Sequence, residues 1–233
     1  MRIELNHNWY ADEPFQVDDD IKQFDVSNRP YPIYRQTIFT RQECDELYLS
    51  VIKDYDSKTD ARVYTPDGLG STVNRDFRDT DSYQQHLYLT QQHHQKLYQG
   101  VQNAANWFNT TLLTQSDVSQ ILGYGRGNKF SHHCDNSITD STGVKWVCND
   151  KARELTAICY ISDQVTEDPK FNEFSGGSLI FSRVRNKHTN EPLVYRPRAG
   201  ELVVFPSNPF YGHEVLNIRS GYRINIVSWW RNV

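Results

Sequence analysis

Apolar residues recur every three to four positions in two segments of the first half, which is the spacing of amphipathic helices. Thr40 and Glu43 have the spacing of a capping box and precede the first segment. Its apolar stripe consists of Cys44, Leu47, Tyr48, Val51 and Ile52. We predict one helix at residues 41–54 and a second from Thr90 to Phe108. The inner face of the second helix would hold His94, Leu97, Val101, Ala104, Ala105 and Phe108.

The second half has a different pattern, with short, continuous apolar runs that are rich in β-forming residues. These runs are ILGY, LTAICYI, GGSLIF, ELVVF and YRINIVSWW, and Gly, Pro, Asn and Asp separate them. Helices followed by many short strands predict a mostly β, α+β fold, with the helices packed on one sheet of a β-sandwich or jelly roll. The polar stretches at residues 1–35 and 57–82, the latter including TPDGLGST, are predicted to be irregular.

Length and composition favour one domain. The chain has 233 residues, of which 37% are hydrophobic and 13% aromatic, enough to bury a sizeable core. Large β domains often reach this length as one unit. We therefore expect a single domain over residues 1–233, with an N-terminal extension at 1–35, a helical support at about 36–110 and a jelly-roll core at about 118–233.

Charge and composition argue against several classes of partner. A net charge of −4 and a pI near 6.1 do not support a broad nucleic-acid surface, so we expect no nucleic-acid partner. The first fifteen residues lack the pattern of a signal peptide, and no stretch reaches the ~18 apolar residues of a membrane helix. The four cysteines form no C-x-x-C pair. We expect a cytoplasmic protein without a membrane partner, and the oligomeric state is left open.

The stretch YGRGNKFSHHCDN contains the first candidates for metal chemistry. In a strand, residues i and i+2 face the same side, so His133 and Asp135 can direct an imidazole and a carboxylate at one ion, while His132 faces the other way. His213, which follows the run ELVVF, can supply a third ligand. Two histidines and one carboxylate form the facial triad of non-haem Fe(II) oxygenases, although zinc accepts the same ligands. We assign the remaining histidines to the surface or to packing: His7, His86, His93, His94 and His188.

Arg223 lies ten residues after His213, within the apolar run GYRINIVSWW. A buried guanidinium needs an anionic partner, and its planar fork suits a carboxylate. A salt bridge to a protein acid is one alternative, but this strand offers no acid. A dicarboxylate that chelates iron at one end and meets Arg223 at the other accounts for both features, and 2-oxoglutarate is such a molecule.

Several motifs now combine into one pattern. Y-x-x-G-x-x-F-x-x-H-x-D is matched by Tyr124, Gly127, Phe130, His133 and Asp135. Further matches are G-G-x-L-x-F at residues 176–181, P-x-x-G-x-x-x-x-F-P at 197–206, then His213-Glu214-Val215, Gly221-Tyr222-Arg223 and Trp229. Taken together, these motifs resemble the Fe(II)/2-oxoglutarate-dependent dioxygenases, specifically the prolyl-4-hydroxylase-like branch. The resemblance covers about residues 36–230.

The resemblance implies a double-stranded β-helix and a set of site residues. His133, Asp135 and His213 would bind Fe(II), and Arg223 would bind the far carboxylate of 2-oxoglutarate. The other pocket residues would be Tyr160 beside that carboxylate, Tyr124 near the metal-bound end, and Leu179 and Trp229 as apolar walls. A core role is the alternative for both tyrosines.

The resemblance also implies a reaction. Dioxygen and 2-oxoglutarate are the co-substrates, succinate and carbon dioxide are products, and one oxygen atom enters a C–H bond, with ascorbate as a stimulant. Halogenating relatives lack the carboxylate that Asp135 supplies, so its presence favours hydroxylation.

The substrate is left open between a peptidyl proline, a free amino acid and a small natural product. Loops at the mouth of a barrel commonly set substrate choice, and three loops look longer here than in compact relatives. Trp146, Arg75 and Arg78 are our candidates for substrate contact. The alternatives are packing of the loop for Trp146, and surface ion pairs with Asp76 and Asp79 for the two arginines.

Two rival interpretations belong to other classes. A cupin that binds zinc, nickel or manganese usually carries H-x-H where this chain has H-x-D. A non-catalytic binding domain with a relict site is the second rival, although every ligand position is intact.

Overall fold

Both predicted helices are present in the computed structural model, which describes residues 2–12, 16–17, 21–64, 70–111, 113–140, 142 and 145–232. Helix α1 spans Arg41–Lys53, and the capping box of Thr40 and Glu43 closes its first turn. Helix α2 spans Gln91–Trp107, and Thr90 caps it together with the side chain of His93. No helix in the described part of the chain is long and apolar enough to cross a membrane.

The larger sheet has the order β4-β20-β15-β23-β11-β9-β5, with β10 paired to β23. Its strands are β4 (Tyr34–Thr37), β5 (Thr59–Asp60), β9 (Asp81–Tyr83), β10 (Leu113–Gln115), β11 (Gln120–Tyr124), β15 (Leu155–Tyr160), β20 (Glu201–Pro206) and β23 (Arg223–Asn232). All the pairings are antiparallel. Every residue of β15 is buried, because both faces of this strand are covered. That is why its sequence is apolar at every position except Thr156, rather than alternating.

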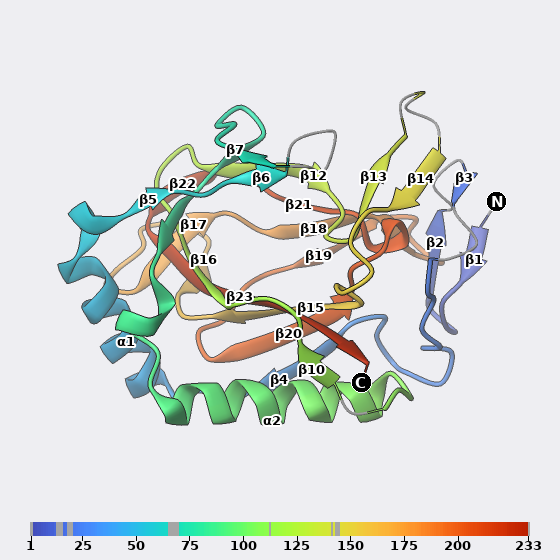
Figure 1. Cartoon of the computed structure of the whole chain (residues 1–233), viewed down its shortest axis with the longest axis horizontal. Helices are drawn as coiled ribbons and strands as arrows, with labels where there is room; N and C mark the ends of the chain where they lie inside the picture. The colour runs from blue at the N-terminus through green and yellow to red at the C-terminus, as the bar shows by residue number, and fades with distance from the viewer. Residues whose placement is uncertain are drawn as a thin grey trace.

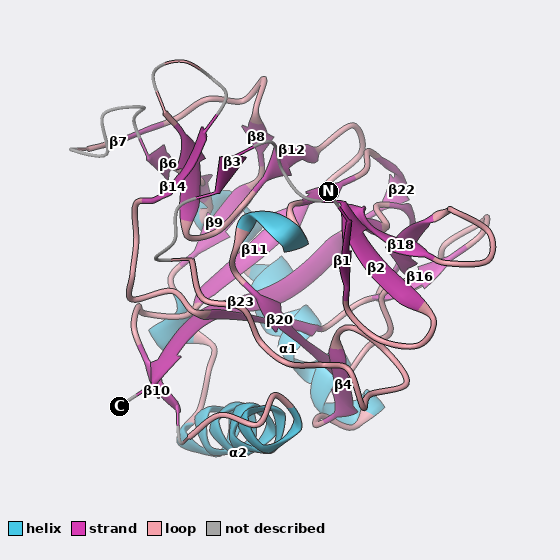
Figure 2. Cartoon of the chain, turned by 90° about the vertical axis from the view of Figure 1, so that its right-hand side faces the viewer, coloured by secondary structure: helices cyan, strands magenta, loops and turns pink. Residues whose placement is uncertain are grey.

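The smaller sheet has the order β1-β2-β18-β21-β12-β8, with β19 paired to β18. Its strands are β1 (Arg2–Glu4), β2 (Trp9–Asp12), β8 (Arg78–Asp79), β12 (Lys129–His133), β18 (Leu179–Asn186), β19 (Pro192–Tyr195) and β21 (His213–Val215). The two sheets enclose the core, and α2 covers the outer side of the larger sheet beside β4 and β20 (Figures 1 and 2). The prediction of a jelly-roll double-stranded β-helix with helices on one sheet is therefore confirmed.

Short elements complete the described structure. One small sheet joins β13 (Ser137–Thr139), β14 (Lys145–Cys148) and β3 (Gln16–Val17), and another joins β16 (Asp163–Val165), β17 (Glu173–Gly176) and β22 (Ile218–Gly221). Strands β6 (Val63–Tyr64) and β7 (Ser71–Thr72) form a hairpin. The 3-10 turns are η1 (Tyr55–Ser57), η2 (Gln85–Leu87) and η3 (Pro209–Tyr211).

The N-terminal extension is more ordered than we predicted. Strand β2 pairs with β18 and so extends the smaller sheet, and Trp9, Tyr10 and Ala11 are buried there. The prediction of an irregular segment was wrong because the apolar run of β2 is too short to stand out in a polar stretch. Its stability comes from the neighbouring strand rather than from its own propensity.

The predicted loop at residues 57–82 also contains strands. Strand β8 joins the smaller sheet, while β5 and β9 join the larger one. This segment therefore connects the two sheets on one side of the barrel. Of the predicted loop signal TPDGLGST, residues 65–69 lie outside the described residues.

Candidate active site

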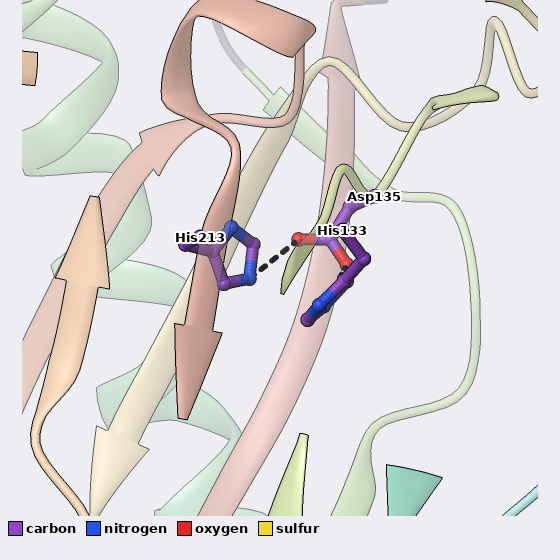
Figure 3. A group of neighbouring side chains, drawn as sticks. All are labelled: His133, Asp135 and His213. Atoms are coloured by element: carbon purple, nitrogen blue, oxygen red, sulfur yellow. Dashed lines mark ion pairs between the residues drawn. The ribbon is translucent and has the colours of Figure 1, made fainter. Parts of the chain in front are cut away.

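His133, Asp135 and His213 come together at the edge where β12 and β21 pair. The antiparallel register places His133 opposite His213, and Asp135 follows two residues after His133. One ligand atom from each residue lies within 4.8 Å of the others. The Nε2 atoms of His133 and His213 lie 3.8 and 3.7 Å from the two carboxylate oxygens of Asp135 (Figure 3). The side chains therefore converge on one point, as the H-x-D spacing predicted.

Hydrogen bonds orient each of these side chains. The Nδ1 atoms of His133 and His213 lie 2.8 and 3.1 Å from the carbonyl oxygens of Ser131 and Tyr211, respectively. An Nδ1–H that donates to a carbonyl leaves the Nε2 lone pair free for a metal. The Thr156 hydroxyl donates to Asp135 at 2.6 Å and so holds the carboxylate in place.

The electrostatics favour the ligand forms of these groups. Burial, reinforced by the neighbouring His213, lowers the pKa of His133 from 6.5 to about 3, so this imidazole is neutral at physiological pH. Burial opposes ionisation of Asp135, but the two imidazoles and the Thr156 hydroxyl hold the pKa of its carboxyl below the usual value. Two imidazoles and one carboxylate are a suitable donor set for a divalent first-row metal.

The two other polar residues of the HHCD stretch lie outside this cluster. The ring of His132 and the thiol of Cys134 both lie beside Gly212, where an added Cβ would approach His132 Nε2 to 2.7 Å. His132 is not among the residues whose ligand atoms converge. This agrees with the alternation expected along a strand.

Arg223 begins β23 and is buried, with 1% of its surface exposed. It donates a hydrogen bond to the carbonyl of Gly177 at 3.0 Å, and its Nε has no partner among the described residues. Its guanidinium carbon lies 4.7 and 5.1 Å from the ring centroids of Tyr124 and Tyr160. No described carboxylate forms an ion pair with Arg223, so the structure does not supply the salt bridge that we considered as an alternative.

Tyr160 lies behind this guanidinium. It is fully buried, and its hydroxyl has no hydrogen-bond partner among the described residues. Burial raises the pKa of Tyr160, against the opposing charge of Arg223. A buried hydroxyl and a buried Nε that no described residue pairs with fit a polar ligand at this point.

A cavity of about 610 Å³ joins the cluster to Arg223. Its lining includes Tyr124, Leu179 and Trp229, which we predicted, but not Tyr160. The volume is within the range of ~300–1,000 Å³ that is usual for small-molecule sites. The cavity therefore has room for a co-substrate and a second small ligand.

The three candidate substrate contacts are placed differently. Trp146 and Arg78 line the cavity. Arg75 does not line it, because this exposed side chain forms ion pairs with Asp60 and Asp79. These contacts match the alternative of surface ion pairs in part, since Asp79 is one of the two expected partners, and substrate contact by Arg75 stays a prediction.

Sequence reasoning missed several residues that shape the site. Thr156 is the polar residue in the run LTAICYI, and this position could have signalled an inward-facing hydroxyl. Arg153 lines the cavity with its guanidinium 4.0 Å from the Trp229 ring, and it forms ion pairs with Asp117 and Asp150. No local pattern distinguishes this arginine from a surface residue.

Comparison with known proteins decides the family. The model of the 2OG-Fe(II) oxygenase superfamily matches residues 119–231, which contain the cluster and Arg223. Residues 119–231 are therefore identified as a member of this superfamily. As a 2OG-Fe(II) oxygenase, the protein is a 2-oxoglutarate-dependent dioxygenase, with Fe(II) as its metal and 2-oxoglutarate and dioxygen as co-substrates. No curated protein sequence gives a significant match.

Solved structures of prolyl hydroxylases share the fold of this oxygenase. A prolyl-4-hydroxylase from Pseudomonas putida is 17% identical, with a TM-score of 0.58 over 88% of this chain and 94% of that one. The 2-oxoglutarate complex of a viral collagen prolyl hydroxylase from Paramecium Bursaria Chlorella virus-1 is 18% identical, with a TM-score of 0.54 over 88% and 97%. A prolyl hydroxylase from Trichoplax adhaerens, in complex with a hypoxia inducible factor peptide fragment, is 17% identical, with a TM-score of 0.59 over 87% and 84%.

Proposed function

We propose that this oxygenase hydroxylates an unactivated C–H bond of a small molecule or peptide. One molecule each of 2-oxoglutarate and dioxygen is consumed, and one oxygen atom enters the substrate while the other enters succinate, with release of carbon dioxide. The observation that carries the proposal is the cluster of His133, Asp135 and His213 in the same cavity as the buried, unpaired Arg223.

The proposed ligands of Fe(II) are His133, Asp135 and His213. Their donor chemistry fits this ion, and ligands on one side of the ion leave other coordination positions accessible from the cavity. Bound iron supplies the activation of dioxygen and the oxidative decarboxylation of 2-oxoglutarate. Retention of the Asp135 carboxylate favours hydroxylation over halogenation.

Arg223 and Tyr160 are the proposed partners of the far carboxylate of 2-oxoglutarate. Arg223 offers several N–H donors that no described residue accepts, and the Tyr160 hydroxyl is also unpaired. Tyr124 would lie near the metal-bound end. Leu179 and Trp229 would be apolar walls that exclude water from the reacting groups.

The proposed substrate classes are a peptidyl proline, a free amino acid and a small natural product. A peptide is bound to the Trichoplax adhaerens structural neighbour, which supports the first class. We also propose that residues 1–233 work as a single domain, since β2 extends the smaller sheet of the core. A cytoplasmic location fits the four free cysteines and would help to keep the iron ferrous.

Melting temperatures test the proposal without turnover. With Mn(II) present under anaerobic conditions, 2-oxoglutarate at ~100 times its dissociation constant should raise the melting temperature by about 5–10 °C. The rise should disappear without metal and in His213→Ala. His188→Ala is the matched control, because this exposed histidine lies outside the cluster. An equal rise in metal-free protein would refute the metal-dependent binding of 2-oxoglutarate.

A further inference from the structure

A second buried arginine faces the same cavity. Arg78, in strand β8 at the edge of the smaller sheet, is 7% exposed and lines the cavity. Two of its five N–H groups are used, in donation to the carbonyl of Arg62 at 2.8 Å and to the side-chain oxygen of Gln120 at 3.2 Å. Within the described part of the chain, its Nε has no partner and no carboxylate pairs with it.

Arg78 lies close to the proposed metal ligands, because both contact the same aromatic ring. Its guanidinium carbon lies 4.9 Å from the centroid of the Phe130 ring, and the same ring stacks on His133 at 3.5 Å. Burial lowers the pKa of Arg78, and the nearby carboxylate of Asp135 opposes this effect. Arg78 therefore faces the reacting part of the cavity rather than the protein surface.

Charge in the cavity is unbalanced. The described residues that line it include four arginines but only one acid, Asp135, although the whole chain has a net charge of −4. Arg153 is neutralised by Asp117 and Asp150, and Arg62 is exposed to water. Arg223 and Arg78 are the two that are buried without an acid.

The proposed cofactors neutralise only part of this charge. Fe(II) brings two positive charges and 2-oxoglutarate brings two negative charges, while Asp135 offsets one arginine. One positive charge is left, and the co-substrate already accounts for Arg223. A buried charge without a partner is costly, so the complete site should take up one more anion next to Arg78.

We propose that Arg78 binds a carboxylate of the substrate, and that the substrate is a small carboxylic acid such as a free amino acid. Three N–H groups of Arg78, including Nε, donate to none of the described residues, and the planar fork of a guanidinium matches a carboxylate. Phe130 and Trp146 offer apolar surface for the rest of the molecule. This inference rests on the proposed function, because it assumes that iron and 2-oxoglutarate occupy the other end.

The test uses full-length protein with Mn(II) and 2-oxoglutarate under anaerobic conditions, and the melting temperature as the readout. The probes are the standard amino acids and short-chain carboxylic acids, each compared with its carboxamide, and end-blocked tripeptides with and without an acidic side chain. At least one small acid should raise the melting temperature, and its carboxamide should not. This comparison needs only the wild-type protein.

Variants then assign the effect to Arg78. Arg78→Gln should weaken binding of the acid at least about 30-fold, as is usual when one partner of a buried charge pair is lost, and Arg78→Lys should recover part of the affinity. Arg75→Gln is the matched control and should change nothing, because this arginine lies outside the cavity lining. All three variants should keep the response to 2-oxoglutarate, which also shows that they fold.

Each other outcome counts against the proposal. If no acid stabilises the protein, if a carboxamide works as well as its acid, or if Arg78→Gln binds the acid normally, then Arg78 does not bind a substrate carboxylate. If only the acidic blocked peptide binds, the small-molecule assignment is wrong. Loss of the 2-oxoglutarate response in wild-type protein would instead refute the proposed function.

Discussion

The cavity has two buried arginines without acidic partners, and they belong to different parts of the fold. Arg223 lies in β23, a long strand in the middle of the larger sheet, and the rings of Tyr124 and Tyr160 surround its guanidinium. Arg78 lies in β8, a two-residue strand at the edge of the smaller sheet. The end of the cavity proposed for the co-substrate is thus built on the core, and the end proposed for the substrate on the periphery.

The different positions of the two arginines in the fold suit two tasks of one cavity, co-substrate binding and substrate selection. A co-substrate that takes part in every turnover benefits from a rigid, preorganised site. A peripheral strand can change without disturbing the central sheet, as is typical of segments that determine specificity. Phe130 contacts both Arg78 and His133, so the end proposed for the substrate adjoins the proposed metal ligands.

The largest effect should come from Arg223→Ala. Loss of the guanidinium should raise the dissociation constant of 2-oxoglutarate by about 30- to 4,000-fold, which is the usual range for truncating one partner of a buried charge pair. Isothermal titration of 2-oxoglutarate into anaerobic Mn(II)-loaded protein measures this. Arg78→Gln removes a charge at the end of the cavity proposed for the substrate. Its dissociation constant for 2-oxoglutarate should stay within about threefold of the wild-type value. An equal loss of 2-oxoglutarate affinity in both variants would contradict the division of the cavity into a co-substrate end and a substrate end.

Thr156→Val should weaken metal binding at the site formed by His133, Asp135 and His213. The variant has nearly the same shape but lacks the hydroxyl that donates to Asp135 at 2.6 Å. Affinity for Fe(II) or Mn(II) should fall by about 10- to 100-fold, as is typical when a group that orients a metal ligand is lost. Ser162→Ala, another buried hydroxyl that lies outside the cavity lining, is a control for general destabilisation. Unchanged metal affinity in Thr156→Val would show that Asp135 needs no such support.

Acid should weaken the metal-free protein through His133. Its pKa is lowered from 6.5 to about 3 in the folded state, so the unfolded state binds the proton more readily between these values. Stability is complete above about pH 6.5 and falls as the pH decreases toward 3, by at most ~1.4 kcal/mol per pH unit for one group. Urea unfolding of metal-free protein at several pH values measures this slope. His133→Gln should flatten it, and an unchanged slope would assign the effect to other groups.

Tyr160→Phe should have the smallest effect, with opposite signs for two properties. The variant loses a hydroxyl that has no partner in the protein, so the metal-free form should be as stable or more stable by up to about 1 kcal/mol. Binding of 2-oxoglutarate should nevertheless weaken several-fold if the hydroxyl contacts its far carboxylate. Thermal unfolding and the titration described above measure the two properties. A variant that binds 2-oxoglutarate normally would make Tyr160 a core residue only.

The central strands and the helices could be predicted from the sequence because their signals are local. Strand β15 is buried on both faces and is apolar except at Thr156, while Thr40 and Glu43 cap α1 as their spacing predicted. The His133 and Asp135 pair follows from the two-residue repeat of a strand. His213 was connected to them by the facial-triad pattern and the family resemblance, not by its local sequence.

The periphery could not be predicted because its structure depends on distant partners. Strands β2 and β8 are short, and each forms by pairing with a strand of the core. Arg75 and Arg78 are three residues apart in the same NRDFRD stretch, yet one pairs with surface acids and the other is buried in the cavity. Only the three-dimensional pairing of β8 with β12 distinguishes them.

Anaerobic absorption spectroscopy tests the central claim most directly. Metal-free protein is loaded with Fe(II), and 2-oxoglutarate is then added in the absence of dioxygen. We predict a metal-to-ligand charge-transfer band that appears with 2-oxoglutarate in wild-type protein and is lost in His213→Ala. Absence of the band in protein that demonstrably holds iron would contradict chelation of 2-oxoglutarate at the cluster of His133, Asp135 and His213.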